Sequence, residues 1–249
     1  MPLFPEISQV QCVVLAGGLG TRLKGVVPDK PKILAPVGGH PFIDHLIGWL
    51  ERQGIARLVF SLGHKADMIR AHLDARKDSA IEIKTVVESE PLGTAGGLIF
   101  ACSALDSDPV LVLNGDSLIE VDLPAFLASH RAKGADVSMV AVQVADAGRF
   151  GGVEIDADDY IRAFREKSPS SSSQPGWINA GIYAFTTSAL EDLKQSQKGS
   201  LEHDFFAVRP HRYLHAYRSQ GKFIDIGTPD TLALADNWLR DSNFEKIKK

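Results

Sequence analysis

The chain has 249 residues, of which 44% are hydrophobic and 23% charged, which fits one large globular domain or two small ones at about 100–200 residues per domain. Its 27 Lys and Arg against 31 Asp and Glu leave a net charge of −4, so it lacks the basic excess typical of proteins that bind nucleic acid or anionic membranes. No apolar run approaches the roughly 18 residues of a membrane-spanning helix, and the start does not resemble a secretory signal. The two cysteines, Cys12 and Cys102, lie among apolar neighbours and predict free thiols in a cytoplasmic protein.

Strand-like and helical patterns alternate in the first half of the chain. Such alternation predicts βαβ units, and therefore an α/β, Rossmann-like, mostly parallel sheet with helices on both faces. The run at residues 110–113 is apolar throughout, as expected of a central strand buried on both faces. The predicted strands are residues 12–15, 58–62, 81–87 and 110–113, and the predicted helices are residues 42–50, 66–73, 96–104 and 123–133.

The second half has closely spaced strand-like segments, which predict antiparallel strands added to the sheet. A Ser- and Pro-rich stretch at residues 168–176 predicts a flexible loop that is too short to link two domains. We find no internal repeat and expect one domain spanning residues 1–249. The further predicted strands are 137–144, 152–155, 160–164, 178–185 and 213–217, and the further helices are 188–194, 201–206 and 229–239.

A glycine-rich loop, L-A-G-G-L-G-T-R at residues 15–22, directly follows the first predicted strand. Its glycines allow the backbone to approach a ligand and point N–H groups at an anion, and Arg22 can add a phosphate contact. A dinucleotide fingerprint is excluded because Leu23 replaces the third glycine, and a Walker A loop because Val26 and Val27 replace the Lys and the hydroxyl residue. On these residues alone, the loop is either an anion site of another kind or a tight turn without a ligand.

A longer pattern contains this loop. L-A-G-G-L-G-T-R-L-K-G-V-V-P-D-K-P-K-I-L-A-P-V-G-G-H-P at residues 15–41 resembles the N-terminal signature of the sugar-1-phosphate nucleotidylyltransferases, or NDP-sugar pyrophosphorylases. It departs at Ile33, where the family commonly has a second proline, but Lys32 is retained. The length and S-L-E-H-D-F-F at residues 200–206 are most similar to the D-glycero-α-D-manno-heptose 1-phosphate guanylyltransferases, which make the GDP-heptose donor for bacterial surface polysaccharides. Other segments similar to family motifs are E-S-E-P-L-G-T-A-G at 88–96, N-G-D at 114–116, E-K at 166–167, N-A-G-I-Y at 179–183 and F-I-D-I-G-T-P at 223–229.

The resemblance implies a fold, a reaction and a set of site residues. The fold is that of the nucleotide-diphospho-sugar transferases, with about residues 10–135 as the nucleotide-binding half and about 136–249 as the sugar-phosphate-binding half. The reaction is attack by a sugar 1-phosphate on the α-phosphorus of GTP, with release of pyrophosphate and without a protein nucleophile. Arg22 and Lys32 would be catalytic, and Asp116 and Asp225 would bind Mg²⁺. The nucleotide would contact Leu15, Ala16, Gly17, Gly18, Gly20, Thr21, Glu88, Gly93 and Thr94, and the sugar phosphate Gly152, Glu166, Lys167 and Asn179.

Plainer interpretations of the same residues remain open. Taken alone, N-G-D is more typical of a turn, and lysines and arginines are usually solvated. The substrate could instead be mannose 1-phosphate or another sugar 1-phosphate, or the chain could be a silent regulatory paralogue that binds a nucleotide sugar. The loop at 168–176 is a hypothetical lid over the sugar phosphate, and a homodimer is implied only by the resemblance. The histidines predict no zinc site, because His211 and His215 are four apart in a strand-like segment and would not share a face.

Overall fold

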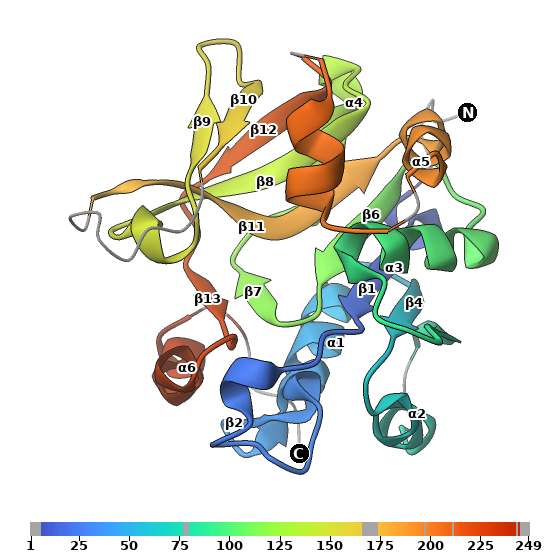
Figure 1. Cartoon of the computed structure of the whole chain (residues 1–249), viewed down its shortest axis with the longest axis vertical. Helices are drawn as coiled ribbons and strands as arrows, with labels where there is room; N and C mark the ends of the chain where they lie inside the picture. The colour runs from blue at the N-terminus through green and yellow to red at the C-terminus, as the bar shows by residue number, and fades with distance from the viewer. Residues whose placement is uncertain are drawn as a thin grey trace.

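A mixed sheet forms the centre of the molecule (Figure 1) in this computed structural model, which describes residues 6–76, 80–165, 174–196, 198–210, 212–242 and 244. Within these residues the sheet has seven strands in the order β12-β8-β11-β6-β1-β4-β5. β6, β1, β4 and β5 are mutually parallel, whereas β11 is antiparallel to both of its neighbours, β6 and β8. The strands are β1 (Gln11–Ala16), β4 (Arg57–Leu62), β5 (Glu82–Val87), β6 (Val110–Asn114), β8 (Val137–Val144), β11 (Gly176–Phe185) and β12 (Leu214–Ser219).

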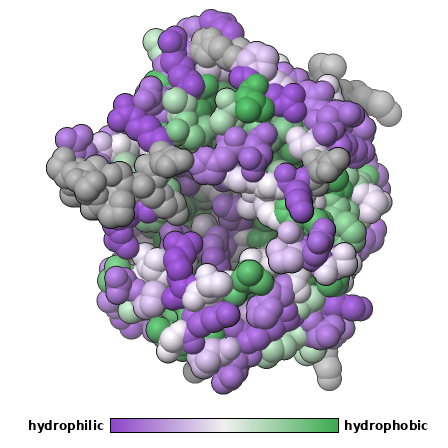
Figure 2. Space-filling model, viewed as in Figure 1, coloured by the Kyte–Doolittle hydropathy of each residue, from purple (hydrophilic) through white to green (hydrophobic). Residues whose placement is uncertain are grey.

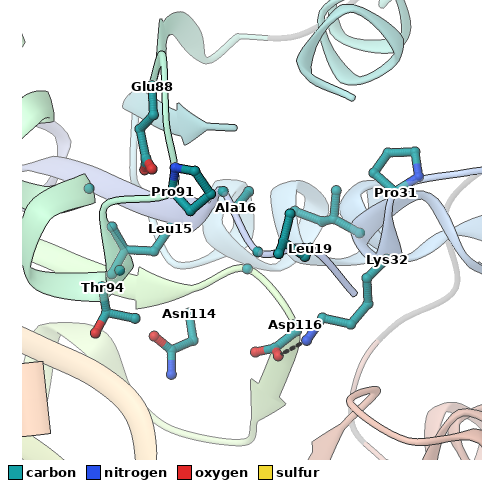
Figure 3. Close-up of a pocket in the computed structure, with 16 residues that line it drawn as sticks. Leu15, Ala16, Leu19, Pro31, Lys32, Glu88, Pro91, Thr94, Asn114 and Asp116 are labelled. Atoms are coloured by element: carbon teal, nitrogen blue, oxygen red, sulfur yellow. Dashed lines mark hydrogen bonds and ion pairs between the residues drawn. The ribbon is translucent and has the colours of Figure 1, made fainter. Parts of the chain in front are cut away.

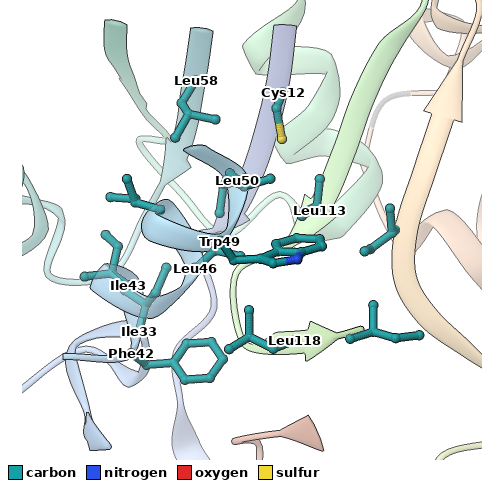
Figure 4. Packing of buried hydrophobic residues seen from close by; sticks show 14 of the residues in the cluster. Cys12, Ile33, Phe42, Ile43, Leu46, Trp49, Leu50, Leu58, Leu113 and Leu118 are labelled. Atoms are coloured by element: carbon teal, nitrogen blue, oxygen red, sulfur yellow. The ribbon is translucent and has the colours of Figure 1, made fainter. Parts of the chain in front are cut away.

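Helices cover both faces of this sheet, because the central strands β1, β4 and β6 are largely apolar on both faces, with their polar residues at or near the strand ends. In β1, Cys12 and Val14 point into one hydrophobic core and Val13 into the other, as alternation along a strand requires. Figure 4 shows Leu46 and Leu50 of α1 packed near Cys12 and Leu113 in the first core. The first core also takes side chains from α2, α4 and α6, and the second from α3 and α5. The helices are α1 (Phe42–Arg52), α2 (Ala66–Asp74), α3 (Gly93–Ala101), α4 (Leu123–Lys133), α5 (Thr187–Lys194) and α6 (Pro229–Asp241).

Three two-stranded sheets lie outside the central sheet in the described residues. The pair that matters for the site joins β7 (Ser117–Ile119), which follows the central strand β6, to β13 (Phe223–Asp225), which precedes α6. The others pair β9 (Val153–Ile155) with β10 (Ile161–Phe164), and β2 (Pro36–Val37) with β3 (His40–Pro41). Of the helices described, none is both long and apolar enough to span a membrane.

The predicted α/β, mostly parallel sheet with helices on both faces is confirmed, with four local corrections. β12 is parallel to β8 rather than antiparallel, because the chain reverses direction after β11 but passes over to the far side of β8, which is itself antiparallel to β11. The strands predicted at 152–155 and 160–164 form a separate pair outside the central sheet. The helix predicted at 96–104 begins at Gly93, and residues 201–205 form a single π-helical turn, not an α-helix.

Candidate active site

A cavity of about 280 Å³ opens at the carboxyl ends of the parallel strands, where ligands bind in open α/β sheets. In Figure 2, which has the same view as Figure 1, the surface is hollowed near the middle, in the area of β7 and β11. The loop after β1 supplies one wall, and the start of α3 supplies the opposite wall. The lining includes Leu15, Ala16, Gly17, Gly18, Leu19, Lys32, Glu88, Gly93, Thr94, Gly97, Asn114 and Asp116.

One end of this cavity holds the carboxylate of Glu88 (Figure 3). Ser61 Oγ shares its proton between Glu88 Oε1, at 3.2 Å, and the carbonyl oxygen of Gly97, at 3.0 Å, and the backbone N–H of Leu92 donates to Oε2 over 3.1 Å. A Cβ on Gly17 or Gly97 would lie 2.9 or 2.7 Å from Oε1. Glycine at both positions therefore makes room for the carboxylate, which these two donors hold at the end of the cavity.

The other end holds an ion pair between Lys32 and Asp116 (Figure 3). Burial raises the pKa of Asp116, but the charge and hydrogen bond of Lys32 and a hydrogen bond from Ser117 outweigh it, so the pKa lies below its usual value. Asp116 is therefore ionised at neutral pH. The cavity thus has a carboxylate at each end, and a cation is paired with the one at the carboxyl end of β6.

Asp225 is brought beside Asp116 by the β7–β13 pair. In this pair Asp225 lies opposite Ser117, the neighbour of Asp116 in the chain, and the N–H of Ile226 donates to the carbonyl of Asp116 over 2.9 Å. Gly227 N–H and Thr231 Oγ1 donate to Asp225 Oδ1 over 2.9 and 3.0 Å, which fixes its orientation. No described group of three or more His, Cys, Asp or Glu side chains could hold a metal by itself. Two hard carboxylates nevertheless suit a divalent ion that takes its remaining ligands from phosphate and water.

A second cavity, of about 460 Å³, meets the first at Asn114 and Asp116, which line both. It opens between the central sheet, the β9–β10 pair and the start of β13. A register shift in β11 between Asn179 and Tyr183 interrupts the pairing with β8 beside this cavity. Among its lining residues are Arg22, Ser117, Phe150, Gly152, Arg165, Asn179, Glu202, His203, Phe223 and Asp225.

The structure brings together most of the residues that the sequence predicted for the site. Leu15, Ala16, Gly17, Gly18, Glu88, Gly93 and Thr94 line the first cavity together with Lys32, whereas Gly152, Asn179 and Asp225 line the second. Arg22 also lines the second cavity. Gly20 and Thr21 line neither cavity: Gly20 adopts a left-handed conformation against Lys32, and Thr21 is exposed at the start of a short turn.

Some predictions fall on residues outside those that the structure describes. Glu166 and Lys167 are among them, as are residues 168–173 of the hypothetical lid and His211. His215 is buried, with its Nδ1 3.3 Å from Ser138 Oγ.

Sequence reasoning overlooked two side chains of the site. Asn114 lines both cavities and lies against β11, since a Cβ on Gly181 would be 2.6 Å from Asn114 Nδ2. Glu202 lies in the second cavity and accepts hydrogen bonds from Asn179 and Tyr183. Both belong to motifs that the sequence analysis quoted, so a signal was present, but the pattern alone did not say that these side chains face a cavity.

Comparison with known proteins decides the family. The model of the nucleotidyl transferase family matches residues 11–242. The chain belongs to this family. It is 34% identical to D-glycero-alpha-D-manno-heptose 1-phosphate guanylyltransferase from Aneurinibacillus thermoaerophilus, over 93% of this chain and 99% of that protein. It is 33% identical to mannose-1-phosphate guanylyltransferase from Mycobacterium tuberculosis, over 89% of this chain but only 62% of that protein.

Comparison with solved structures agrees with this family and identifies the fold. The structure of HddC from Yersinia pseudotuberculosis complexed with GMP-PN has a TM-score of 0.82 and 33% identity, and the match covers 92% of this chain and 99% of that one. A putative glucose-1-phosphate thymidylyltransferase from Bacillus anthracis has a TM-score of 0.73 at 22% identity, which supports the fold alone. The predicted nucleotide-diphospho-sugar transferase fold is confirmed.

Proposed function

We propose that this protein transfers a guanylyl group from GTP to a sugar 1-phosphate, with D-glycero-α-D-manno-heptose 1-phosphate as the sugar substrate. The observation that carries the proposal is the meeting of two cavities at Asp116. GTP would occupy the first cavity and the sugar phosphate the second, so that the α-phosphorus and the attacking oxygen meet at their junction. Positioning and charge neutralisation are the main tasks of a protein in such a transfer.

The carboxylate of Glu88 favours guanine as the base. A carboxylate has about four acceptor positions, and two of those on Glu88 are used by Ser61 and Leu92. The remaining positions can accept the adjacent N–H groups of guanine, including its 2-amino group, which adenine lacks. GTP would then lie with its base at Glu88 and its phosphates toward Lys32 and Asp116, the arrangement of the two ends in Figure 3.

At the junction, the phosphate oxygen of the sugar would form a bond to the α-phosphorus while the bond to pyrophosphate breaks. Lys32 would bind the triphosphate, and Arg22 would stabilise charge from the side of the second cavity. Asp116 and Asp225 would hold Mg²⁺, which supplies charge neutralisation at the phosphates when bound. On the sugar side, Gly152 and Asn179, which line the second cavity, would contact the sugar phosphate.

The choice of the heptose rests on two relatives of that name that are 34% identical to this chain over 93% and 89% of its residues. The relatives from Aneurinibacillus thermoaerophilus and Campylobacter jejuni that are named heptose 1-phosphate guanylyltransferases are matched over 99% and 96% of their length. The mannose-1-phosphate guanylyltransferase from Mycobacterium tuberculosis is matched over only 62%.

Pyrophosphate release with Mg²⁺ tests this proposal. GTP, ATP, UTP and dTTP would each be paired with heptose 1-phosphate, mannose 1-phosphate and glucose 1-phosphate, and release only from GTP with the heptose phosphate is expected. Faster release with mannose 1-phosphate would overturn the sugar, and faster release with another nucleotide would overturn the base. Asp116→Ala should abolish release, whereas Asp106→Ala, which removes an exposed carboxylate paired with Arg57, should not.

A further inference from the structure

A short segment, Gly199–Glu202, lies between the two cavities and contacts the linings of both. On the side of the first cavity, it is hydrogen-bonded to the loop that enters α3. The N–H of Gly199 donates to the carbonyl of Leu92 over 2.9 Å, and the N–H of Ala95 donates to the carbonyl of Gly199 over 2.9 Å. The N–H of Leu201 donates to Thr94 Oγ1 over 2.8 Å. Thr94 itself lines the first cavity.

This segment packs tightly against the start of α3, so neither backbone can move freely. Gly93 has a φ of +75°, and a Cβ there would lie 2.3 Å from the carbonyl oxygen of Gly199. The backbones of the two segments are therefore in direct contact, and a displacement of one requires a displacement of the other.

On the side of the second cavity, the segment ends in the side chain of Glu202. Its Oε1 accepts hydrogen bonds from Asn179 Nδ2 and from Tyr183 Oη, each over 2.9 Å, and its Oε2 accepts one from Ser200 Oγ over 2.7 Å. Asn179 Nδ2 also donates to Tyr183 Oη over 2.6 Å. Burial and the nearby charge of Glu202 raise the pKa of Tyr183, so its hydroxyl keeps its proton and remains a donor. The amide of Asn179 is thus held in the second cavity by Glu202.

We propose that Gly199–Glu202 couples the two substrate sites: a nucleotide bound against Thr94 stabilises the segment, and the segment in turn positions Asn179 through Glu202 for the sugar phosphate. This rests on the proposed function. Glu202 is a positioning residue in this scheme, and Thr94 acts on the sugar site through Leu201. Because coupling between binding sites is reciprocal, the sugar phosphate must tighten nucleotide binding by the same factor.

Calorimetric titration measures this factor. Heptose 1-phosphate would be titrated into the full-length protein with Mg²⁺, alone and with a saturating α,β-methylene analogue of GTP, which cannot transfer its guanylyl group. We expect the analogue to tighten the binding of the sugar phosphate by about 5-fold or more. Thr94→Val removes the acceptor for Leu201 N–H and should reduce the factor to near one, whereas Thr94→Ser keeps the hydroxyl and should retain it.

Glu202→Gln tests the other end of the segment. It should weaken binding of heptose 1-phosphate by about 3- to 10-fold, the effect of one altered hydrogen bond, and leave binding of the analogue alone unchanged. Glu191→Gln, at an exposed position on α5, controls for the loss of a negative charge. The effects of Thr94→Val and Glu202→Gln on the coupling factor should be non-additive in the double variant, because both substitutions interrupt the same connection.

The outcomes separate the coupling from the proposed function. An unchanged factor in Thr94→Val, or a factor of one in the wild-type protein that binds both ligands, refutes the coupling and leaves the proposed function standing. Failure of the wild-type protein to bind either ligand would overturn both.

Discussion

A buried chain of polar side chains, outside both cavities, predicts a marked loss of stability at mildly acidic pH. His130 of α4 lies with Nδ1 2.9 Å from Ser138 Oγ of β8, which is 3.3 Å from Nδ1 of His215 in β12. All three side chains are at most 3% exposed. Burial lowers the pKa of both histidines from 6.5 to about 4, and the charges of neighbouring lysine and arginine side chains add to this.

The direction of the change in stability with pH follows from which state of the protein, folded or unfolded, binds the protons. Below pH 6.5 the unfolded chain takes up a proton on each histidine, whereas the folded protein does not until pH approaches about 4. The free energy of unfolding therefore falls as pH decreases through this window. From pH 7 to pH 5 the loss is roughly 2 kcal/mol for each of His130 and His215, from about 1.4 kcal/mol per pKa unit.

Urea unfolding at pH 7.0 and pH 5.0, at constant ionic strength, measures the loss. His130→Asn and His215→Asn keep a hydrogen-bonding group for Ser138 and remove the titration, so each should reduce the difference between the two pH values by roughly 2 kcal/mol. His64→Asn, at an exposed position, controls for replacement of a histidine. A double variant that loses as much stability between pH 7 and pH 5 as the wild-type protein would refute the reasoning.

Three further predictions concern the two cavities. Asp225→Asn should lower turnover by about 100-fold or more, because it removes charge at the transferring phosphates; turnover close to that of the wild type in the pyrophosphate assay would contradict its proposed role. Gly93→Ala should lower the melting temperature more than Gly134→Ala, because both residues have a positive φ but only the Cβ at Gly93 would meet a backbone atom, the oxygen of Gly199; equal losses would show that the contact is not restrictive. Glu88→Gln should reduce the preference for GTP over ATP in kcat/KM by about 10-fold, and an unchanged ratio would remove Glu88 from base recognition.

The central strands and the loop at their carboxyl edge could be predicted from local patterns in the chain. Runs such as residues 110–113, apolar at every position, are stable only when buried on both faces, so they specify central parallel strands without knowledge of the rest. The glycine-rich loop after β1 left a tight turn or an anion site open, and the resemblance of the longer segment at residues 15–41 to the nucleotidylyltransferases favoured the nucleotide site. Local patterns of this kind depend on neighbours in the chain and can be read from it directly.

Contacts between distant residues could not be predicted in this way, because they depend on how the whole fold packs. The pairing of β7 with β13 places Asp225 beside Asp116 across more than 100 residues of chain, and both strands have only three residues. Such short strands carry too little periodicity to be predicted as partners. The same is true of Gly199–Glu202: its hydrogen bonds to Thr94 and Asn179 depend on how α3 and β11 pack, and no local pattern encodes that arrangement.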